Sequence, residues 1–283
     1  MILIFYNNKI TNQDFLNYLL GITRNVLVIS FNELKKVKVV DSTHENTIWH
    51  YQDRVINFND VTGIYNEIYY LNLKDFEDYA PSDREYVCSE WTAYIMFIMQ
   101  KYHTRVFNPF NHHILSGDMF NLPFIYKMSS DKGLTTPRLT ISMDKMELEE
   151  LSQKGEFIAL TNLTEKIAFQ KCELLPANCV GLIEYIIGSP IIVHVLGDIV
   201  FACEVNGNEK KEYSLPAEIK KICIQITLEL GLNLSEFLFK KDLESNLILY
   251  RFSHIPRFIN NSAQNLQNLY LCLGNKLLNN LSE

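Results

Sequence analysis

The sequence predicts a mixed α/β and α+β protein that is built in three parts. The chain opens as a β-α-β unit over residues 1–30, which is typical of an α/β domain. A β-hairpin follows much later, over residues 189–207, and after it come an amphipathic helix, a second hairpin and a closing helix. Hairpins alternating with helices in this way indicate α+β subdomains.

The first part, residues 1–115, begins with the apolar run MILIFY, which predicts a strand. Large apolar side chains then recur at helical spacing, namely Phe15, Tyr18, Leu19 and Ile22. Val26–Ser30 predicts the second strand, and no GxGxxG motif follows the first one, so a dinucleotide fingerprint is absent. The run Tyr86–Tyr102 contains no Gly or Pro and predicts a long buried helix, which VFNPFNHH ends.

The second part, residues 116–175, alternates short helices with short strands. FNLPFIYKMSSDKGL predicts a helix that ends at Gly133, and TTPRLTIS predicts a strand after it. A helix capped by Ser142 is expected to run to about Gln153, and FIALTNL predicts a second strand.

The third part, residues 176–283, contains the two hairpins. The first reverses at Gly197–Asp198, where Asp198 is expected to be a turn residue. The helix that follows ends at Gly231, and its apolar face is formed by Ile219, Ile222, Ile226 and Leu230. FLFKKDLESNLILYRF predicts the second hairpin, and QNLQNLYLCLGNKLLNNL predicts a closing helix.

Composition narrows the class of protein. Of the 283 residues, 47% are hydrophobic and 21% are charged, which is typical of a globular protein. A net charge of −7 argues against nucleic acid or an anionic membrane as the main partner. No apolar run is long enough to span a bilayer, and the start MILIFYNNK lacks the basic region of a signal peptide. The six cysteines form no CxxC pair, so we expect reduced thiols in a cytoplasmic protein.

The order of motifs in the last hundred residues resembles the ATP-grasp superfamily. In that family an apolar strand ends in Gln-Glu-aromatic-Ile-x-Gly and a hairpin reads Val-Gly-Asp-x-Val-Phe-Ala. The run LIEYIIGSPIIVHVLGDIVFACEV places matching residues at Glu184, Tyr185, Ile186, Gly188, Gly197, Asp198, Val200, Phe201 and Ala202. GLTTPRLTIS is similar to the family's Gly-Leu-x-x-Pro-x-Thr segment, which leads into its small subdomain.

Upstream, VTGIYNE and DREYVCSEWTAYI with VFNP resemble the peptide-modifying ATP-grasp ligases, which build ester or amide crosslinks in ribosomal peptides. The resemblance implies an ATP-grasp architecture: an N-terminal α/β domain over residues 1–115, a small subdomain over 116–175 and a C-terminal subdomain over 176–283. The two subdomains are expected to form a cleft.

The residues that would contact triphosphate and magnesium in this family differ here. The phosphate-binding lysine of the small-subdomain strand is replaced by Ala159 or Leu160, and the arginine of the first hairpin by Ile192. The metal-binding aspartate aligns with Leu238. The Glu-x-Asn step that binds magnesium aligns with Arg251 and Ser253. The resemblance therefore implies loss of the ordinary reaction.

Three residues are candidates for nucleotide binding. Glu184 is either the acceptor of an adenine hinge or an ordinary carboxylate at a strand end, and Ile186 belongs to the same segment. Lys127 is either a substitute for the missing phosphate lysine or a solvated lysine on a helix. His194 is expected to be a packed core histidine, and the pair His112–His113 to lie in a loop without a metal.

Five residues are candidates for binding an anion or a peptide: Arg251, Lys240, Arg257, Arg84 and Trp91. Strand periodicity predicts that Leu249, Arg251 and Ser253 share one face. The alternative is a solvated basic edge strand around Arg251 and Lys240, and a surface charge cluster around a buried Trp91. A guanidinium can bind a carboxylate or phosphate without any metal.

The sequence thus favours a degenerate ATP-grasp protein of a ribosomal peptide maturation lineage. It would bind a precursor peptide or a partner maturation enzyme and would need no cofactor. One alternative is an active, divergent ATP-dependent carboxylate–amine or carboxylate–hydroxyl ligase that uses ATP and magnesium. Another is an enzyme with metal-free chemistry in the same cleft. A homodimer is possible for all of these.

Overall fold

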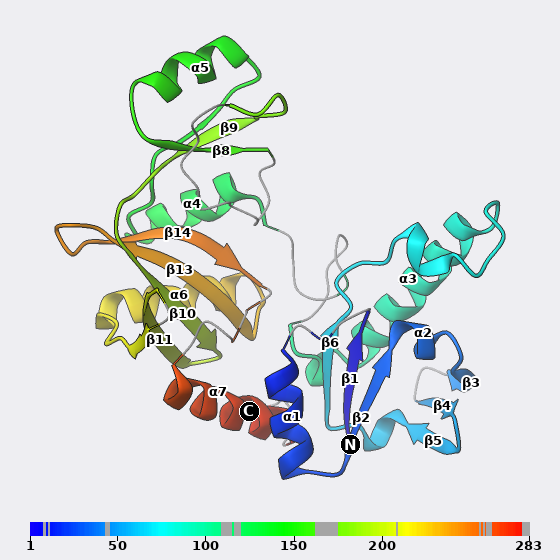
Figure 1. Cartoon of the computed structure of the whole chain (residues 1–283). Coiled ribbons are helices and arrows are strands. Elements are labelled where there is room, and N and C mark those ends of the chain that lie inside the picture. The colour runs from blue at the N-terminus through cyan, green and yellow to red at the C-terminus, as the bar shows by residue number, and fades with distance from the viewer. Residues whose placement is uncertain are drawn as a thin grey trace. The chain divides into compact units, whose positions relative to one another are not determined.

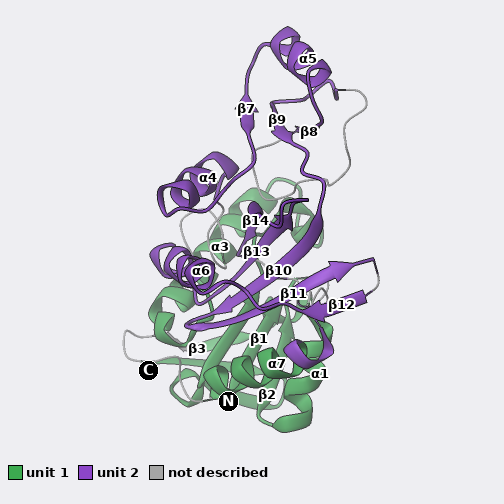
Figure 2. Cartoon of the chain, turned by 90° about the vertical axis from the view of Figure 1, so that its left-hand side faces the viewer, with its two compact units in different colours: residues 1–118, 266–283 green, residues 119–265 purple. Residues whose placement is uncertain are grey.

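The computed structural model describes residues 1–7, 10, 12–42, 46–108, 115, 120–161, 175–207, 209–254, 256, 258 and 262–278. Arg257, His112–His113 and Cys172 lie outside these residues. The chain forms two compact units, Met1–Asp118 with Leu266–Glu283, and Met119–Asn265 (Figure 2). The finer division at residues 115 and 175 stays a prediction.

The first unit is an α/β unit. Its elements are β1 (Ile2–Tyr6), α1 (Gln13–Ile22), β2 (Val26–Ser30), α2 (Phe31–Leu34), β3 (Lys38–Ser42), β4 (Thr47–Tyr51), β5 (Arg54–Asn57), β6 (Gly63–Glu67), α3 (Arg84–Lys101) and α7 (Ala263–Leu278), with 3-10 turns at Phe58–Asp60, Leu73–Phe76 and His103–Arg105. β1 lies between β2 and β6 and runs parallel to both (Figure 1), which confirms the predicted β-α-β opening.

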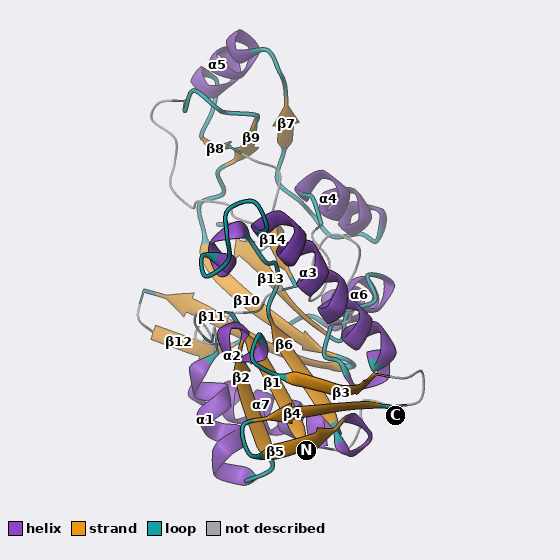
Figure 3. Ribbon diagram, turned by 90° about the vertical axis from the view of Figure 1, so that its right-hand side faces the viewer, coloured by secondary structure: helices purple, strands orange, loops and turns teal. Residues whose placement is uncertain are grey.

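A second, antiparallel sheet in this unit has the order β3-β4-β5 (Figure 3). Its central residue is Trp49, which is 1% exposed and packs against Phe5 and Phe58 with ring centroids 6.0 and 4.6 Å apart. The closing helix α7 contacts α1, since the rings of Phe15 and Tyr270 lie 5.5 Å apart. Aromatic packing therefore joins α1, near the start of the chain, to the closing helix α7.

The helix predicted for the run Tyr86–Tyr102 forms as α3, but the prediction that it is buried is wrong for its first half. Ile95, Ile98 and Met99 in the second half are buried, whereas Tyr86 is 68% exposed. The reason is that apolar side chains occur on all sides of this helix, so the sequence does not show which part packs on the core. Tyrosine and tryptophan also tolerate partial exposure because each carries a polar tip.

The second unit is an α+β unit. Its elements are α4 (Leu122–Asp131), β7 (Leu139–Ile141), α5 (Lys145–Gln153), β8 (Phe157–Leu160), β9 (Gly181–Glu184), β10 (Ser189–Leu196), β11 (Ile199–Asn206), β12 (Glu209–Glu212), α6 (Ala217–Glu229), β13 (Leu234–Lys241) and β14 (Leu247–Ser253). They form a five-stranded sheet, β12-β11-β10-β13-β14, and a three-stranded sheet, β7-β9-β8. Both predicted hairpins and the helix between them are confirmed.

One face of the five-stranded sheet is the core of this unit. Val193, Phe237 and Phe239 on that face cluster with Ile226 of α6 and Tyr126 of α4. The Tyr126 hydroxyl donates to the Tyr250 carbonyl at 2.9 Å, which fastens α4 to the edge strand β14. The polar residues of the opposite face form the candidate site.

One helix start differs from the prediction. The N-cap of α5 is Asp144, whose side chain accepts from the Met146 amide at 2.9 Å, and not Ser142. Ser142 instead donates to the Glu147 carboxylate at 2.6 Å and accepts from the Asp144 amide. Both residues are good caps, so local sequence does not discriminate between them. No helix among the described residues is long and apolar enough to cross a bilayer.

Gly188, directly before β10, lies against the backbone of β13. A Cβ at this position would collide with the carbonyl oxygen of Lys241 on β13. We expect Gly188→Ala to lower the free energy of unfolding by about 1–3 kcal/mol, as overpacking does elsewhere. Gly21 in α1 has no atom within 4 Å of its added Cβ, so Gly21→Ala should stabilise by about 0.5–1 kcal/mol. Urea denaturation of both variants measures the difference, and two losses of equal size would contradict this packing.

Candidate functional site

Three of the positions at which this sequence differs from the ATP-grasp pattern lie side by side in the sheet. Ile192 on β10 lies opposite Leu238 on β13, and Leu238 lies opposite Arg251 on β14. These are the positions that the resemblance assigns to the phosphate arginine and to two metal ligands. Ile192 is 6% and Leu238 4% exposed. We call this set the Ile192–Leu238–Arg251 row.

A β-bulge in β14 decides which side chains join the row. Phe239 pairs with Leu249 but Leu238 pairs with Arg251, so Tyr250 is an extra residue in the strand. Leu249 therefore shares the core face with Phe239, and Arg251 shares the opposite face with Leu238. The prediction that Leu249, Arg251 and Ser253 lie on one face is wrong for Leu249, because a bulge shifts the period of two.

The row borders a buried ionic cluster formed by Arg251, Glu236 and His194. An Arg251 Nη donates to Glu236 Oε1 at 2.5 Å, and His194 Nε2 lies 3.2 Å from Glu236 Oε2. His194 is 0% exposed and Glu236 is 1% exposed, so the carboxylate has left water almost completely. A buried charge is stable only when a partner compensates it. Here Arg251 supplies the compensating positive charge.

The described residues of this row do not fit a magnesium ion. Magnesium prefers carboxylate, carbonyl and water oxygens. Ile192 and Leu238 offer no side-chain oxygen, and the Arg251 guanidinium would repel a cation. The Glu236 carboxylate is already hydrogen-bonded to Arg251. No cluster of three or more potential metal ligands of the His, Cys, Asp or Glu type occurs in the described part of the chain.

The predicted adenine-hinge segment is tied to Tyr250. The Tyr250 hydroxyl donates to the Glu184 carbonyl at 2.8 Å and also has a hydrogen bond with the Ile186 backbone. Tyr250 is fully buried, and burial holds the pKa of its phenol well above the ordinary value. The Glu184 carboxylate accepts from the Arg138 amide at 3.1 Å. Both polar groups of Glu184 therefore have partners within the protein.

The remaining candidate residues lie apart from the row or at its margin. Lys127 is exposed on α4 and pairs with Asp131 one turn away at 3.0 Å. Lys240 donates to the Gly188 carbonyl at 3.3 Å, and partial burial lowers the pKa of its ammonium. Leu160 on β8 is 3% exposed. Anion binding by Arg251, Lys240 and Arg257 stays a prediction.

Arg84 and Trp91 both belong to α3 in the other unit. The Arg84 guanidinium donates to the carbonyl oxygens of Glu77 and Tyr79, both at 3.1 Å, and so fixes the loop before the helix. Trp91 is half-buried and packs edge-to-face on Phe31 with centroids 5.7 Å apart. Their predicted role in peptide binding is separate from the row and is likewise untested.

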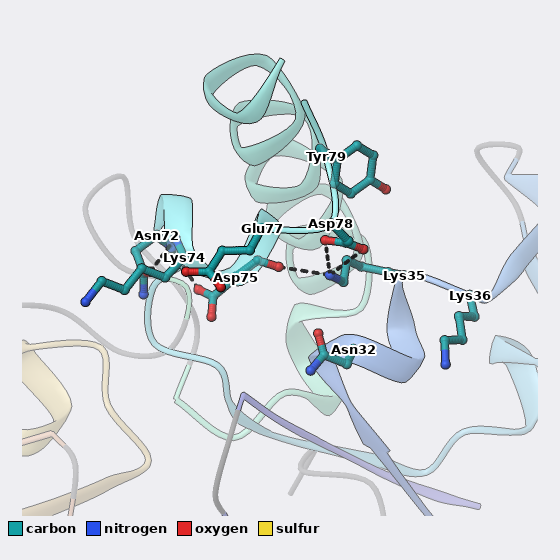
Figure 4. A pocket seen from close by; sticks show the side chains of 9 residues that line it. All are labelled: Asn32, Lys35, Lys36, Asn72, Lys74, Asp75, Glu77, Asp78 and Tyr79. Carbon is teal, nitrogen blue, oxygen red and sulfur yellow. Dashed lines mark hydrogen bonds and ion pairs between the residues drawn. The ribbon is translucent and has the colours of Figure 1, made fainter. Parts of the chain in front are cut away.

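The first unit also contains a polar cavity of about 650 Å³ (Figure 4). Figure 4 shows Lys35 pointing toward the Asp75 carbonyl, at 2.9 Å, and the Asp78 carboxylate, at 3.1 Å. Lys36 and Lys74 extend away from this ion pair. The remaining residues that line the cavity are Asn32, Asn72, Glu77 and Tyr79. Three lysines and three acids balance here, so the cavity favours neither sign of charge.

Sequence reasoning missed Glu236 and Tyr250, and it found His194 only as a core residue. His194 is indeed buried, with its ring 5.7 Å from that of Phe258. Glu236 lies in the apolar run LSEFLF. A single carboxylate in such a run is the signal from which a buried ion pair could have been predicted. The extra residue Tyr250 leaves no signal in the periodicity.

Solved structures of peptide-modifying ATP-grasp ligases resemble this chain over nearly its full length. Macrocyclase MdnC from Microcystis aeruginosa MRC, bound with precursor peptide MdnA, has a TM-score of 0.72 and 13% identity, covering 98% of this chain and 99% of that one. ATP-grasp ligase PsnB, complexed with minimal precursor, Mg and ADP, has a TM-score of 0.74 and 15% identity, covering 98% of each chain.

A Chryseobacterium gregarium RiPP-associated ATP-grasp ligase, in complex with ADP and a leader and core peptide, has a TM-score of 0.69 and 11% identity, covering 98% of this chain and 96% of that one. No family model and no curated protein sequence matches the chain. These similarities show that the protein has the ATP-grasp fold of the peptide-modifying ligases, as the sequence motifs predicted.

The ionic cluster should be essential for stability. Arg251→Met leaves the Glu236 carboxylate buried without its guanidinium, and breaking such a pair costs about 3–5 kcal/mol. Adding Glu236→Gln removes the buried charge whose contact with Arg251 was lost, so the double variant should be more stable than the sum of the two single variants predicts. Lys127→Met breaks an exposed pair and should change stability by less than about 0.5 kcal/mol.

Urea denaturation of these four variants gives the coupling between Arg251 and Glu236. If the changes in free energy of unfolding of the two single variants added up to that of the double variant, Arg251 and Glu236 would not be coupled. The ion pair would then contribute no more than a surface contact does.

Proposed function

We propose that this protein is a degenerate ATP-grasp protein of a ribosomal peptide maturation lineage. It binds a peptide or a partner maturation enzyme in the cytoplasm and does not ligate carboxylates. The observation that carries the proposal is the Ile192–Leu238–Arg251 row, in which two positions are apolar and the third is a cation bound to an internal carboxylate.

The chemistry of the fold explains why these positions matter. Phosphoryl transfer depends on positioning and on cations that neutralise the phosphate oxygens. Leu160 and Ile192 would supply no positive charge to the phosphates, and Leu238 no ligand to a metal. Each lost contact of this kind removes several kcal/mol of transition-state stabilisation. We therefore expect turnover to be absent and not merely slow.

The hinge contacts support the same proposal. An adenine would compete with Tyr250 for the Glu184 carbonyl and for the Ile186 backbone, and it would do so without phosphate contacts to compensate. Lys127, which is exposed and paired with Asp131, adds no phosphate contact in this arrangement. The protein should therefore require neither ATP nor magnesium as a cofactor.

Peptide binding is supported by the structures of similar fold. MdnC is described as bound with a precursor peptide, and the Chryseobacterium ligase with a leader and core peptide. Binding a peptide does not require the phosphate-contacting side chains, so this capacity can remain after ligation is lost. A partner maturation enzyme would be recruited in the same way.

The second candidate function is an active, divergent ATP-dependent ligase that acts on a peptide. It is favoured by the nucleotides bound in structures of similar fold, since PsnB is complexed with Mg and ADP and the Chryseobacterium ligase with ADP. In that case catalytic groups outside the row would hold ATP and magnesium. The two functions make opposite predictions for nucleotide binding.

Mg·ATP should leave the stability of the protein unchanged. A protein that binds ATP gains about 2.7 kcal/mol when ATP is present at 100 times its dissociation constant. We expect no shift in the thermal unfolding midpoint with ATP and MgCl2 in millimolar excess, and no heat of binding in calorimetry. A saturable, EDTA-sensitive stabilisation, or phosphate release in the presence of a peptide substrate, would contradict the proposal and support the active ligase.

A further inference from the structure

A second binding feature lies on the first unit, between β3 and α3. It is a groove of about 320 Å³, close to the lower limit of volumes for ligand pockets. Its lining residues are Val37, Val39, Glu90, Trp91 and Tyr94. We call it the Trp91 groove. None of these residues belongs to the Ile192–Leu238–Arg251 row or to the polar cavity.

The aromatic walls of the groove are held rigidly. Trp91 and Tyr94 meet edge-to-face, with centroids 5.9 Å apart and planes at 82°. The Trp49 indole N–H donates to the Tyr94 hydroxyl at 2.6 Å, and Trp91 packs on Phe31. Burial raises the pKa of Tyr94 to about 12, so its ring stays neutral at physiological pH. The two rings therefore form a fixed corner before any ligand binds.

The third wall is aliphatic and the rim is acidic. Val39 is 45% exposed and lies on the face of β3 that carries Trp49 on its neighbour β4. Glu90 is exposed at the edge of the groove, and no ion pair joins it to another residue in the described part of the chain. The groove thus combines an apolar surface, two aromatic rings and one carboxylate that no cation among the described residues pairs with.

We propose that the Trp91 groove binds the side chain of a lysine or arginine in a partner peptide. This inference rests on the proposed function, peptide binding, and names the chemistry of the residue that is recognised. The aliphatic stem of such a side chain would pack on Val37 and Val39, as long basic side chains do on apolar surfaces. Its charge would meet the Glu90 carboxylate and the rings of Trp91 and Tyr94, which attract cations.

Other side chains fit the groove less well. An aspartate or glutamate would be repelled by Glu90 and by the negative faces of the rings. A leucine would use the apolar wall but would leave the carboxylate unpaired. The groove therefore favours a basic side chain over an uncharged or acidic one of similar length.

The test uses three acetylated and amidated pentapeptides, Gly-Val-Lys-Val-Gly and its counterparts with norleucine or glutamate in the centre. Norleucine keeps the aliphatic stem and removes the charge. Binding is followed by tryptophan emission, because the chain has two tryptophans and Trp49 is 1% exposed, so Trp91 dominates the response. We expect the lysine peptide to bind about tenfold more tightly than the norleucine peptide, and the glutamate peptide not to bind.

Substitutions locate the interaction. Glu90→Gln should weaken the lysine peptide about tenfold and leave the norleucine peptide unchanged. Glu85→Gln is the matched control, since Glu85 is an exposed glutamate on the same helix that does not line the groove. Equal affinities for the lysine and norleucine peptides, or no binding of any peptide at about 10 mM, would overturn the inference. Equal effects of the two substitutions would overturn it as well.

The outcome is independent of the nucleotide experiment. Glu90→Gln changes no residue of the Ile192–Leu238–Arg251 row. Equal affinities of the unsubstituted protein for the lysine and norleucine peptides would therefore overturn the inference about the Trp91 groove alone, whereas Mg-dependent turnover would overturn the proposed function alone. Sedimentation of the free protein tests whether a second copy of the chain occupies the Trp91 groove. Self-association that Glu90→Gln abolishes would show that a second copy fills the groove, and the inference would then fail.

Discussion

The buried carboxylate of Glu236 is the constraint on which the second unit depends. It lies on β13, between β10 and the edge strand β14, and is 1% exposed, so it requires a positive partner inside the protein. In this chain the partner is Arg251 on the neighbouring strand, at 2.5 Å. The Arg251 guanidinium fixed there compensates the Glu236 carboxylate, at a position that the sequence resemblance assigns to a metal ligand of the ATP-grasp family.

The other replacements are consistent with this charge balance. Leu238 on β13 lies beside Arg251, and Ile192 on β10 lies beside Leu238, so the surface next to the ion pair carries apolar side chains. The bulge at Tyr250 orients Arg251 toward that face and turns Leu249 to the core. The Tyr250 hydroxyl in turn hydrogen-bonds to Glu184 at the end of β9. One irregular strand thus connects the ionic cluster to the predicted hinge segment.

Much of the fold could be predicted from the sequence because its elements are strongly patterned. The hairpin that turns at Gly197–Asp198 and the opening β-α-β unit follow from apolar runs bounded by turn residues. The sheet β3-β4-β5 was not predicted, because its strands are short and its one deeply buried tryptophan, Trp49, stands among polar residues. The extent of burial along α3 also could not be predicted, since its apolar residues lie on several sides of the helix.

The candidate site was predicted in part. The resemblance assigns Ile192, Leu238 and Arg251 to phosphate- and metal-contacting positions, and that assignment stays a prediction. The strand register shows that these three residues lie side by side. The partner of Arg251 was not predicted, although Glu236 lies on the facing strand of the predicted hairpin. A single carboxylate in an apolar strand does not indicate which cation pairs with it. Side-chain pairing across strands depends on register, and here a bulge alters that register.

The central claim is that this protein, with the Ile192–Leu238–Arg251 row that it carries, does not bind a nucleotide-bound metal ion. Manganese(II) substitutes for magnesium and its electron paramagnetic resonance spectrum changes when a protein binds the Mn·ATP complex. Titrating this protein into Mn·ATP should leave the spectrum unchanged at every protein concentration. A broadened spectrum that grows in proportion to the protein and saturates at one metal per chain would contradict the claim.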